Sequence, residues 1–139
     1  MGEAMNVAPL LAVSLAASVA APTRPSGTAT DGLFRCALTT ILDGDGLIEC
    51  DGRQRIRLPG IVALPPTGIS SVILAALSVS FTADPLACVQ VGERDGHAVA
   101  WCGTNQGEDL SCEMIREGVS RRDPATDPEG RLRACVARP

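Results

Sequence analysis

The stretch that decides the fold is LDGDGLIECDGRQRIRLPGI, residues 42–61. Asp43-Gly44-Asp45-Gly46 is a turn cluster of the kind that closes hairpins, and Asp51-Gly52 is a second one. The residues between the two turns, Leu47–Cys50, predict a short strand. The residues after the second turn, Gln54–Leu58, alternate polar and apolar side chains like a strand with one buried face. The stretch therefore predicts two consecutive hairpins.

The flanking residues complete this first unit. Phe34–Leu42 is apolar and rich in Thr, which predicts the first strand, and Pro59-Gly60 ends the third. After a break at Pro65–Gly68, Ser70–Val79 is a continuous apolar run. A buried helix capped by one of its first two serines is the preferred interpretation, although the Ile and Val of this run leave a strand open.

A second hairpin is predicted from Leu86–Val91 and His97–Cys102. Arg94-Asp95-Gly96 suits a three-residue loop with Gly96 in the left-handed conformation. In this register Glu93 faces His97.

Helices are expected in the last third of the chain. Asp109–Glu117 is amphipathic, and Gly118 is a suitable C-terminal stop. Asp127-Pro128-Glu129 combines a capping Asp, a Pro at the first position and an acid in the first turn, which predicts a short helix to about Ala137. The fold class is therefore α+β and mainly β. We expect a five-stranded OB-type barrel with a helix after the third strand and short C-terminal helices.

The N-terminal residues differ in composition from the rest. Val7–Ala21 is apolar apart from two serines and ends in small residues, which is typical of a signal peptide cleaved near Ser18-Val19-Ala20. The segment before it contains Glu3 and no positive charge, so an uncleaved anchor and a disordered Ala-rich tail stay open. The expected organisation is a signal peptide at 1–21, a linker at 22–32 and one domain at 33–139. This organisation predicts a periplasmic or secreted protein with no membrane contact after cleavage.

All six cysteines lie downstream of this segment. An even number in a small exported chain predicts disulfides. The hairpin register places Cys88 opposite Cys102, so we expect these two to be bonded. The absence of a CxxC pair and the presence of a single His argue against a structural zinc site. Free thiols in a reducing compartment are the alternative if the chain is not exported.

Composition limits the function classes. The chain has no Lys, and its 12 Arg are mixed with 16 Asp and Glu, for a net charge of -4. Strong nonspecific binding to nucleic acid relies on a basic surface, so this balance argues against it. Aromatic residues, on which single-stranded bases stack, are scarce at 2%.

Three blocks together resemble the staphylococcal-nuclease (thermonuclease) family in its exported bacterial form. They are residues 42–61, the hairpin VGERDGHAVAWC at 91–102 and GEDLSCEMIREGVSRR at 107–122, within Phe34–Arg122. The resemblance implies a five-stranded barrel and a calcium-dependent phosphodiesterase that uses two metal-binding Asp, a Glu base and two phosphate-holding Arg. Asp45 matches the first metal ligand, with Asp43 beside it in the turn. Arg57 matches the first arginine.

The other catalytic positions of the family are replaced. Val62 stands in place of the second metal-binding Asp, Pro65 in place of the Glu, and His97 in place of the second Arg. Removing one electrostatic stabiliser typically lowers a rate by about 10²–10³, so the three losses together predict a degenerate site. We expect no cofactor, with Ca²⁺ relevant only if some activity remains.

Three functions follow as hypotheses. The preferred one is an exported binding or scaffold module whose partner the sequence does not identify, with a weakly bound nucleic acid or a protein left open. The alternatives are a weak or altered calcium-dependent nuclease, and a disulfide-stabilised structural protein of the envelope. A groove lined by Arg57 and Arg94 would distinguish the binding module from the structural protein. In the structural interpretation Asp43 and Asp45 simply form a turn, and Arg57 pairs with Glu49 or Asp51.

Overall fold

The computed structural model describes residues 32–139, so the predicted signal peptide and nearly all of the predicted linker lie outside the described residues. The elements in chain order are β1 (Leu33–Cys36), β2 (Leu38–Ile41), β3 (Leu47–Cys50), β4 (Gln54–Arg57), β5 (Ile61–Ala63), α1 (Ser70–Ser80), β6 (Leu86–Arg94), β7 (His97–Gly103), α2 (Leu110–Arg116) and β8 (Ser120–Arg122). The prediction of an α+β fold that is mainly β is confirmed.

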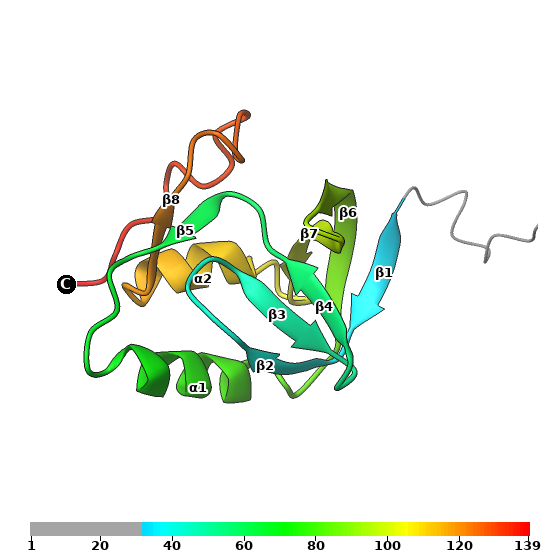
Figure 1. Ribbon diagram of the computed structural model, residues 1–139, viewed down its shortest axis with the longest axis horizontal. Helices are drawn as coiled ribbons and strands as arrows, with labels where there is room; N and C mark the ends of the chain where they lie inside the picture. Colours follow the sequence, from blue (N-terminus) through cyan, green and yellow to red (C-terminus); the bar gives the residue numbers. More distant parts are fainter. Residues whose placement is uncertain (1–31) are drawn as a thin grey trace, which may run out of the picture.

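The strands form one six-stranded mixed sheet and one two-stranded sheet. The large sheet has the order β1-β6-β7-β4-β3-β2, and β5 pairs with β8. Only β4 and β7 run parallel, with Arg57 opposite Val99; the other pairs are antiparallel. The two edges of the large sheet, β1 and β2, are consecutive in the chain and separated by Ala37 alone. In Figure 1, α1 lies next to β2, and α2 lies with the β5–β8 pair at the end of the molecule away from β1.

The run after Pro65–Gly68 forms a helix, α1, as preferred over a strand. Neither serine caps it. The N-cap is Ile69, which makes no side-chain cap, and the Ser70 hydroxyl instead accepts a hydrogen bond from the Thr67 amide at 2.8 Å. Inside the helix, the buried Ser78 hydroxyl accepts from the Ile41 amide at 2.8 Å and so ties α1 to β2.

The second hairpin differs from its predicted form at the turn. Asp95 and Gly96 have φ of 53° and 77°, so they form a two-residue turn in which Arg94 faces His97. The predicted three-residue loop and the Glu93–His97 pairing are therefore wrong. The register shifts by one residue between Gln90 and Gly92. This bulge cancels the error at the turn.

Cys88 faces Cys102 as predicted, because the bulge restores the register further along the hairpin. The two residues form a disulfide with their Cα atoms 4.1 Å apart. The other disulfides join Cys36 to Cys50 and Cys112 to Cys135, and no cysteine is free. Three disulfides fit an extracellular or periplasmic protein. Neither helix of residues 32–139 has the length and apolar character needed to cross a membrane.

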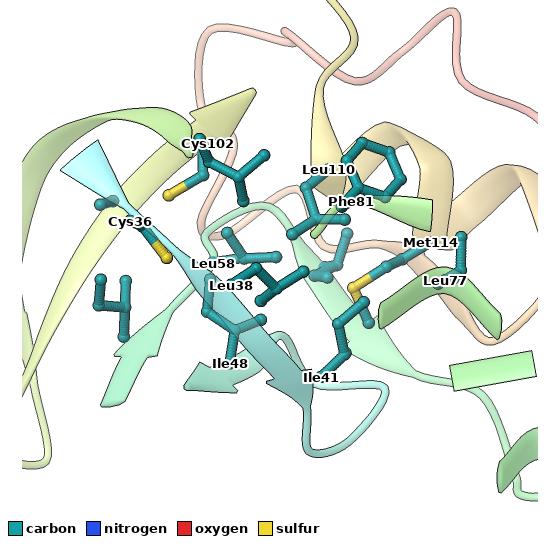
Figure 2. Close-up of a cluster of buried hydrophobic side chains, with 14 of the residues drawn as sticks. Cys36, Leu38, Ile41, Ile48, Leu58, Leu77, Phe81, Cys102, Leu110 and Met114 are labelled. Atoms are coloured by element: carbon teal, nitrogen blue, oxygen red, sulfur yellow. The ribbon is translucent and has the colours of Figure 1, made fainter. Parts of the chain in front are cut away.

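Aliphatic side chains supply most of the core. Figure 2 shows Leu77 of α1 and Met114 of α2 gathered with Ile41 of β2, and all three are at most 6% exposed. Of the three aromatic residues, Phe81 is buried in the core, whereas Phe34 and Trp101 are half-buried and pack against the core. The core is therefore built without large aromatic contributions, as the composition indicates.

The last helix predicted from the sequence does not form. Asp109 caps α2, since its side chain accepts from the Cys112 amide at 3.3 Å, and Gly118 follows α2 as the expected stop with φ of 77°. The residues after Asp127, however, form a series of turns rather than a helix to Ala137. The Asp127 side chain is drawn into the core, 1% exposed, and Gly130 adopts φ of 72° one turn later. A helix cannot continue through this left-handed residue.

Candidate functional site

A cavity of about 520 Å³ lies between the C-terminal end of β4, the β6–β7 hairpin and the chain after β8. Its lining combines apolar walls with charged groups of both signs. The lining residues are Asp45, Arg57, Leu58, Pro59, Ile61, Val91, Gly92, Glu93, Arg94, Val99, Trp101, Ala125, Thr126, Asp127, Pro128, Glu129 and Arg131. Cavities of this size accommodate small organic molecules. Asp45 and Arg57, which the sequence singled out, thus share one cavity, as do Arg57 and Arg94.

Asp43 has a structural role in the first turn. Its Oδ1 accepts hydrogen bonds from the amides of Asp45 at 2.9 Å and Leu47 at 3.1 Å, as an Asx turn does. It does not line the cavity. Cys88 and Cys102 are also structural, because their disulfide is at most 1% exposed and joins two strands that are already paired.

Asp45 faces the cavity but is partly engaged. Its Oδ1 accepts a hydrogen bond of 2.7 Å from the Ala63 amide, which attaches the first turn to β5. Of the family's other catalytic positions, Arg57 lines the same cavity, whereas the three replaced ones, Val62, Pro65 and His97, lie outside the lining. Calcium needs six to eight oxygen ligands, several of them carboxylates. Residues 32–139 contain no group of three or more His, Cys, Asp or Glu that could hold a metal. The donor set around Asp45 therefore does not fit calcium.

Arg57 is the unusual member of the cavity. It lies on β4 opposite Leu47, and its Nε is the one buried side-chain nitrogen or oxygen in residues 32–139 that has no hydrogen-bond partner. The predicted alternative, a pair with Glu49 or Asp51, is wrong, because none of the ion pairs in residues 32–139 joins Arg57 to either residue, and Glu49 pairs with Arg55 at 3.8 Å. Buried polar groups are nearly always satisfied, so an orphaned guanidinium nitrogen in a cavity requires an explanation.

Two further arginines lie at the cavity. Arg94 is exposed on the hairpin, with its Nε 3.8 Å from Asp95. Arg131 places its guanidinium carbon 4.5 Å from the centre of the Trp101 ring, a cation–π geometry. Its Nη2 also lies 3.2 Å from Asp109 Oδ2. Burial raises the pKa of Asp109, while Arg131 and the amides of Cys112 and Ser111 act to lower it.

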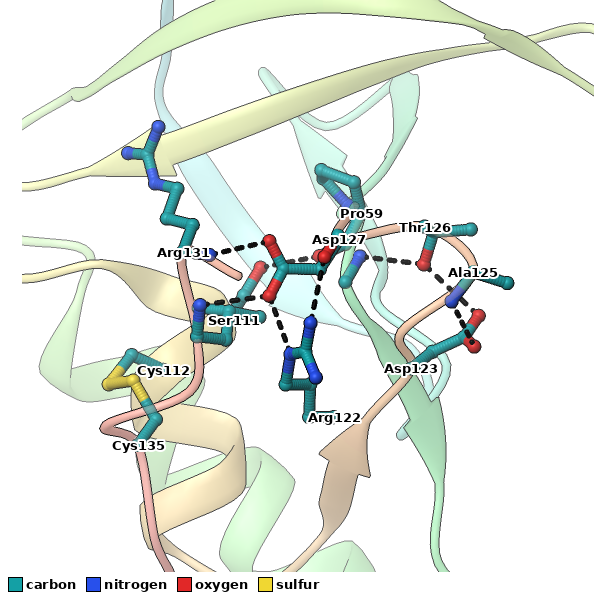
Figure 3. Close-up of polar contacts among 12 residues, drawn as sticks. Pro59, Ser111, Cys112, Arg122, Asp123, Ala125, Thr126, Asp127, Arg131 and Cys135 are labelled. Carbon is teal, nitrogen blue, oxygen red and sulfur yellow. Dashed lines mark hydrogen bonds and ion pairs between the residues drawn. A yellow bond between two sulfur atoms is a disulfide. The ribbon is translucent and has the colours of Figure 1, made fainter. Parts of the chain in front are cut away.

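An ion pair between Arg122 and Asp127 holds the part of the cavity wall that contains Asp127 (Figure 3). Arg122 donates from Nε to Asp127 Oδ2 at 2.7 Å and from Nη2 to the Asp127 carbonyl at 2.8 Å. The Asp127 carboxylate also accepts from the amides of Arg131 at 2.8 Å and Leu132 at 2.9 Å. Burial acts to raise the pKa of Asp127, but these hydrogen bonds outweigh it, and the pKa lies below its ordinary value. Asp127 is therefore a fixed carboxylate that positions the cavity wall.

Gly60, between the cavity residues Pro59 and Ile61, allows close packing beside the cavity. Its φ is 84°, and a Cβ at this position would lie 2.6 Å from Leu132 Cδ1 and 2.9 Å from Trp101 Cη2. Its amide donates to Thr126 Oγ1 at 2.9 Å. The glycine of the first motif therefore lets the chain after β8 pack against Trp101.

The sequence pattern missed Trp101 and Arg131 as cavity residues. Trp101 is the only Trp of the chain and lies on a predicted strand, which is a weak signal. Arg131 gave no signal, because its segment was assigned to a helix. A scan of family models and a search of curated proteins found no match to this chain.

Proposed function

We propose that this protein is a catalytically degenerate, thermonuclease-like OB-fold protein that acts as an exported binding module and holds a small organic anion in the Arg57 cavity. The observation that carries the proposal is the buried, unpartnered Nε of Arg57. A buried donor without a partner costs about 1–3 kcal/mol, and more for a charged group. A guanidinium forms its strongest hydrogen bonds with anionic oxygens, so an anion is the partner that suits this donor best.

The connectivity of the large sheet supports an OB-type barrel. Its edges β1 and β2 are two halves of one chain segment, interrupted only at Ala37, whose carbonyl accepts from the Asp51 amide at 2.8 Å. The Cys36–Cys50 disulfide further joins β1 to β3. A sheet whose two edges belong to one bent segment leaves few free edge groups, which is the arrangement of a small, partly open barrel.

The chemistry of the cavity favours binding over hydrolysis. Phosphodiester hydrolysis of the family type needs a metal and a base, and Asp45 has one oxygen engaged by Ala63 and no acidic partner at Val62. An arginine alone stabilises negative charge without supplying a nucleophile. The residues therefore support an anion site in which substrate-like groups are held but not cleaved.

The shape of the cavity favours binding over a purely structural role. Arg57 and Arg94 both line it, which is the feature that distinguishes a binding module from an envelope protein without a ligand. About 520 Å³ suits a small molecule better than a nucleic-acid strand or a protein. Its walls include Ile61, Val99 and Trp101. The ligand expected here has an anionic head and an apolar body.

The test is a calorimetric titration with phenyl phosphate, which has both parts. Arg57→Gln removes the unpartnered guanidinium, and Arg55→Gln is the matched control on the same strand, half exposed and outside the cavity lining. We expect Arg57→Gln to weaken binding about 10- to 100-fold, the range of one charge-assisted hydrogen bond, and Arg55→Gln to leave it unchanged. Equal affinity of the two variants, or no saturable binding by the wild type, would refute the proposal.

A further inference from the structure

One wall of the cavity belongs to a segment without regular structure. We call residues 123–139 the C-terminal segment; it contains neither helix nor strand. Its residues 125–129 and Arg131 line the cavity opposite Arg57 and the β6–β7 hairpin. The position of this wall therefore depends on individual contacts rather than on a sheet or a helix.

Those contacts fall into two groups. Near β8, Asp127 binds Arg122 and also accepts from the amides of Arg131 and Leu132, Thr126 accepts from the Gly60 amide, and Leu132 is buried in the core. At the far end, Cys135 is bonded to Cys112 of α2, and the Arg138 amide donates to the Arg116 carbonyl at 2.8 Å. The Arg138 side chain also contacts Glu113 and Glu117, but it is 55% exposed, so these ion pairs hold weakly. The disulfide is the strongest attachment at this end.

This disulfide is also the most accessible of the three. Cys36, Cys50, Cys88 and Cys102 are at most 1% exposed, and Cys112 is 5% exposed, whereas Cys135 is half-buried. The two inaccessible disulfides join strands of one sheet, which hydrogen bonds also hold. Thiolate attack requires access to a sulfur, and exposed disulfides are the labile ones. A dithiol therefore reaches Cys112–Cys135 first.

The tethered segment supplies a cation to the cavity. Arg131 precedes Cys135 by four residues and lies over Trp101. Its contact with Asp109 uses one edge of the guanidinium, and an arginine has five N–H donors. Figure 3 shows the Arg131 side chain pointing away from Asp127, so its guanidinium takes no part in the ion pair between Asp127 and Arg122.

We infer that Arg131 is the second anion-binding residue of the Arg57 cavity and that the Cys112–Cys135 disulfide is a redox-sensitive latch that holds it there. The inference rests on the proposed function. A dithiol supplies two electrons and two protons, the Cys112–Cys135 bond becomes two thiols, and the dithiol closes to its own disulfide. The end of the segment after Leu132 loosens, the Arg131 side chain is held less firmly over Trp101, and the affinity for the anion falls.

The experiment follows the purified protein with phenyl phosphate as the probe. Mild dithiothreitol followed by alkylation and mass spectrometry identifies which cysteines open, and hydrogen exchange then compares residues 123–139 with β6–β7. We expect Cys112 and Cys135 to be modified first, exchange to rise at least about tenfold in 123–139 alone, and affinity to fall at least about tenfold. The double variant C112A/C135A should reproduce both changes without reductant. Arg131→Gln should lower affinity, while Arg133→Gln, exposed on the same segment, should not.

Several outcomes overturn the inference. They are earlier modification of another cysteine pair, unchanged exchange in 123–139, unchanged affinity after reduction, or equal affinity of the Arg131 and Arg133 variants. If the double variant does not fold, the reduced wild type gives the same comparison. Failure of the proposed function is recognised separately, because the oxidised wild type would then bind no phenyl phosphate. In that case hydrogen exchange after reduction still tests the latch. A rise confined to residues 123–139 would support it, and the absence of such a rise would refute it.

Discussion

Replacing Arg57 by Met should make the protein more stable while it loses its ligand. The Arg57 Nε is buried without a partner, at a cost of about 1–3 kcal/mol in the folded state. Met keeps a long flexible stem next to Leu47 and Val99, the strand neighbours of Arg57, and buries no unpaired donor. We therefore expect the free energy of unfolding to rise by about 1 kcal/mol, or Tm by roughly 4–8 °C for a domain of this size.

Thermal and urea unfolding of the Arg57→Met and Arg55→Met variants provide the measurement. Arg55 lies on the same strand and forms an exposed pair with Glu49 at 3.8 Å, so its replacement should lower stability by no more than about 1 kcal/mol. Phenyl phosphate at ten times its dissociation constant for the wild type should stabilise the wild type by about 1.4 kcal/mol and Arg57→Met by no more than about 0.4 kcal/mol. A loss of more than about 1 kcal/mol in unliganded Arg57→Met would refute the reasoning, since it would mean that Arg57 stabilises the fold by contacts within the protein.

Three other predictions concern the frame of the cavity and its chemistry. Asp127→Asn should destabilise the protein by about 3–5 kcal/mol at neutral pH, because it leaves the partly buried Arg122 without its carboxylate. The pKa of Asp127 is lowered in the folded state, so its contribution to the free energy of unfolding is present above about pH 4 and is lost as the pH falls through the folded pKa. Denaturation at pH 7 and pH 3 should therefore show that the variant loses less stability in acid than the wild type does. Gly60→Ala should lower the free energy of unfolding by about 1–3 kcal/mol more than Gly52→Ala does, because both glycines have positive φ but only Gly60 lies against Leu132 and Trp101. The midpoints of urea unfolding of the two variants provide the comparison. Single-stranded and duplex DNA should remain intact in calcium as in chelator, and cleavage that needs calcium and is lost in Asp45→Ala would contradict the missing metal ligand at Val62.

The sequence predicted the parts of the fold that short-range chemistry determines. The turns at Asp43–Gly46 and Asp51-Gly52 and the helix at α1 follow from local patterns, whereas the Cys88–Cys102 pair was predicted correctly only because two errors in the hairpin register cancel. The hairpin turn was wrong by one residue, although Asp95-Gly96 is a common pair in a two-residue turn with positive φ, and the bulge that compensates it is next to Gly92, an isolated strand glycine that is only a weak signal.

The C-terminal residues and the cavity could not be predicted because long-range contacts determine them. Asp127-Pro128-Glu129 is a good local helix start, yet Arg122 and the core side chain Leu132 hold Asp127 in a turn instead. Arg57 was identified from its motif, but its lack of a partner depends on the parallel pairing of β4 with β7, which places Val99 and not an acid beside it. Arg131 reaches the cavity only through the folded C-terminal segment.

The most direct test of an anion site that works without metal is a titration of phenyl phosphate followed by the fluorescence of Trp101, the only Trp and a cavity residue. The titration is performed once in calcium and once in chelator. The structure predicts a saturable change in fluorescence with the same dissociation constant in both, because Arg57 and Arg131 hold the anion and the surroundings of Asp45 do not fit calcium. Binding that appears only in calcium, or no saturable change at all, would contradict it.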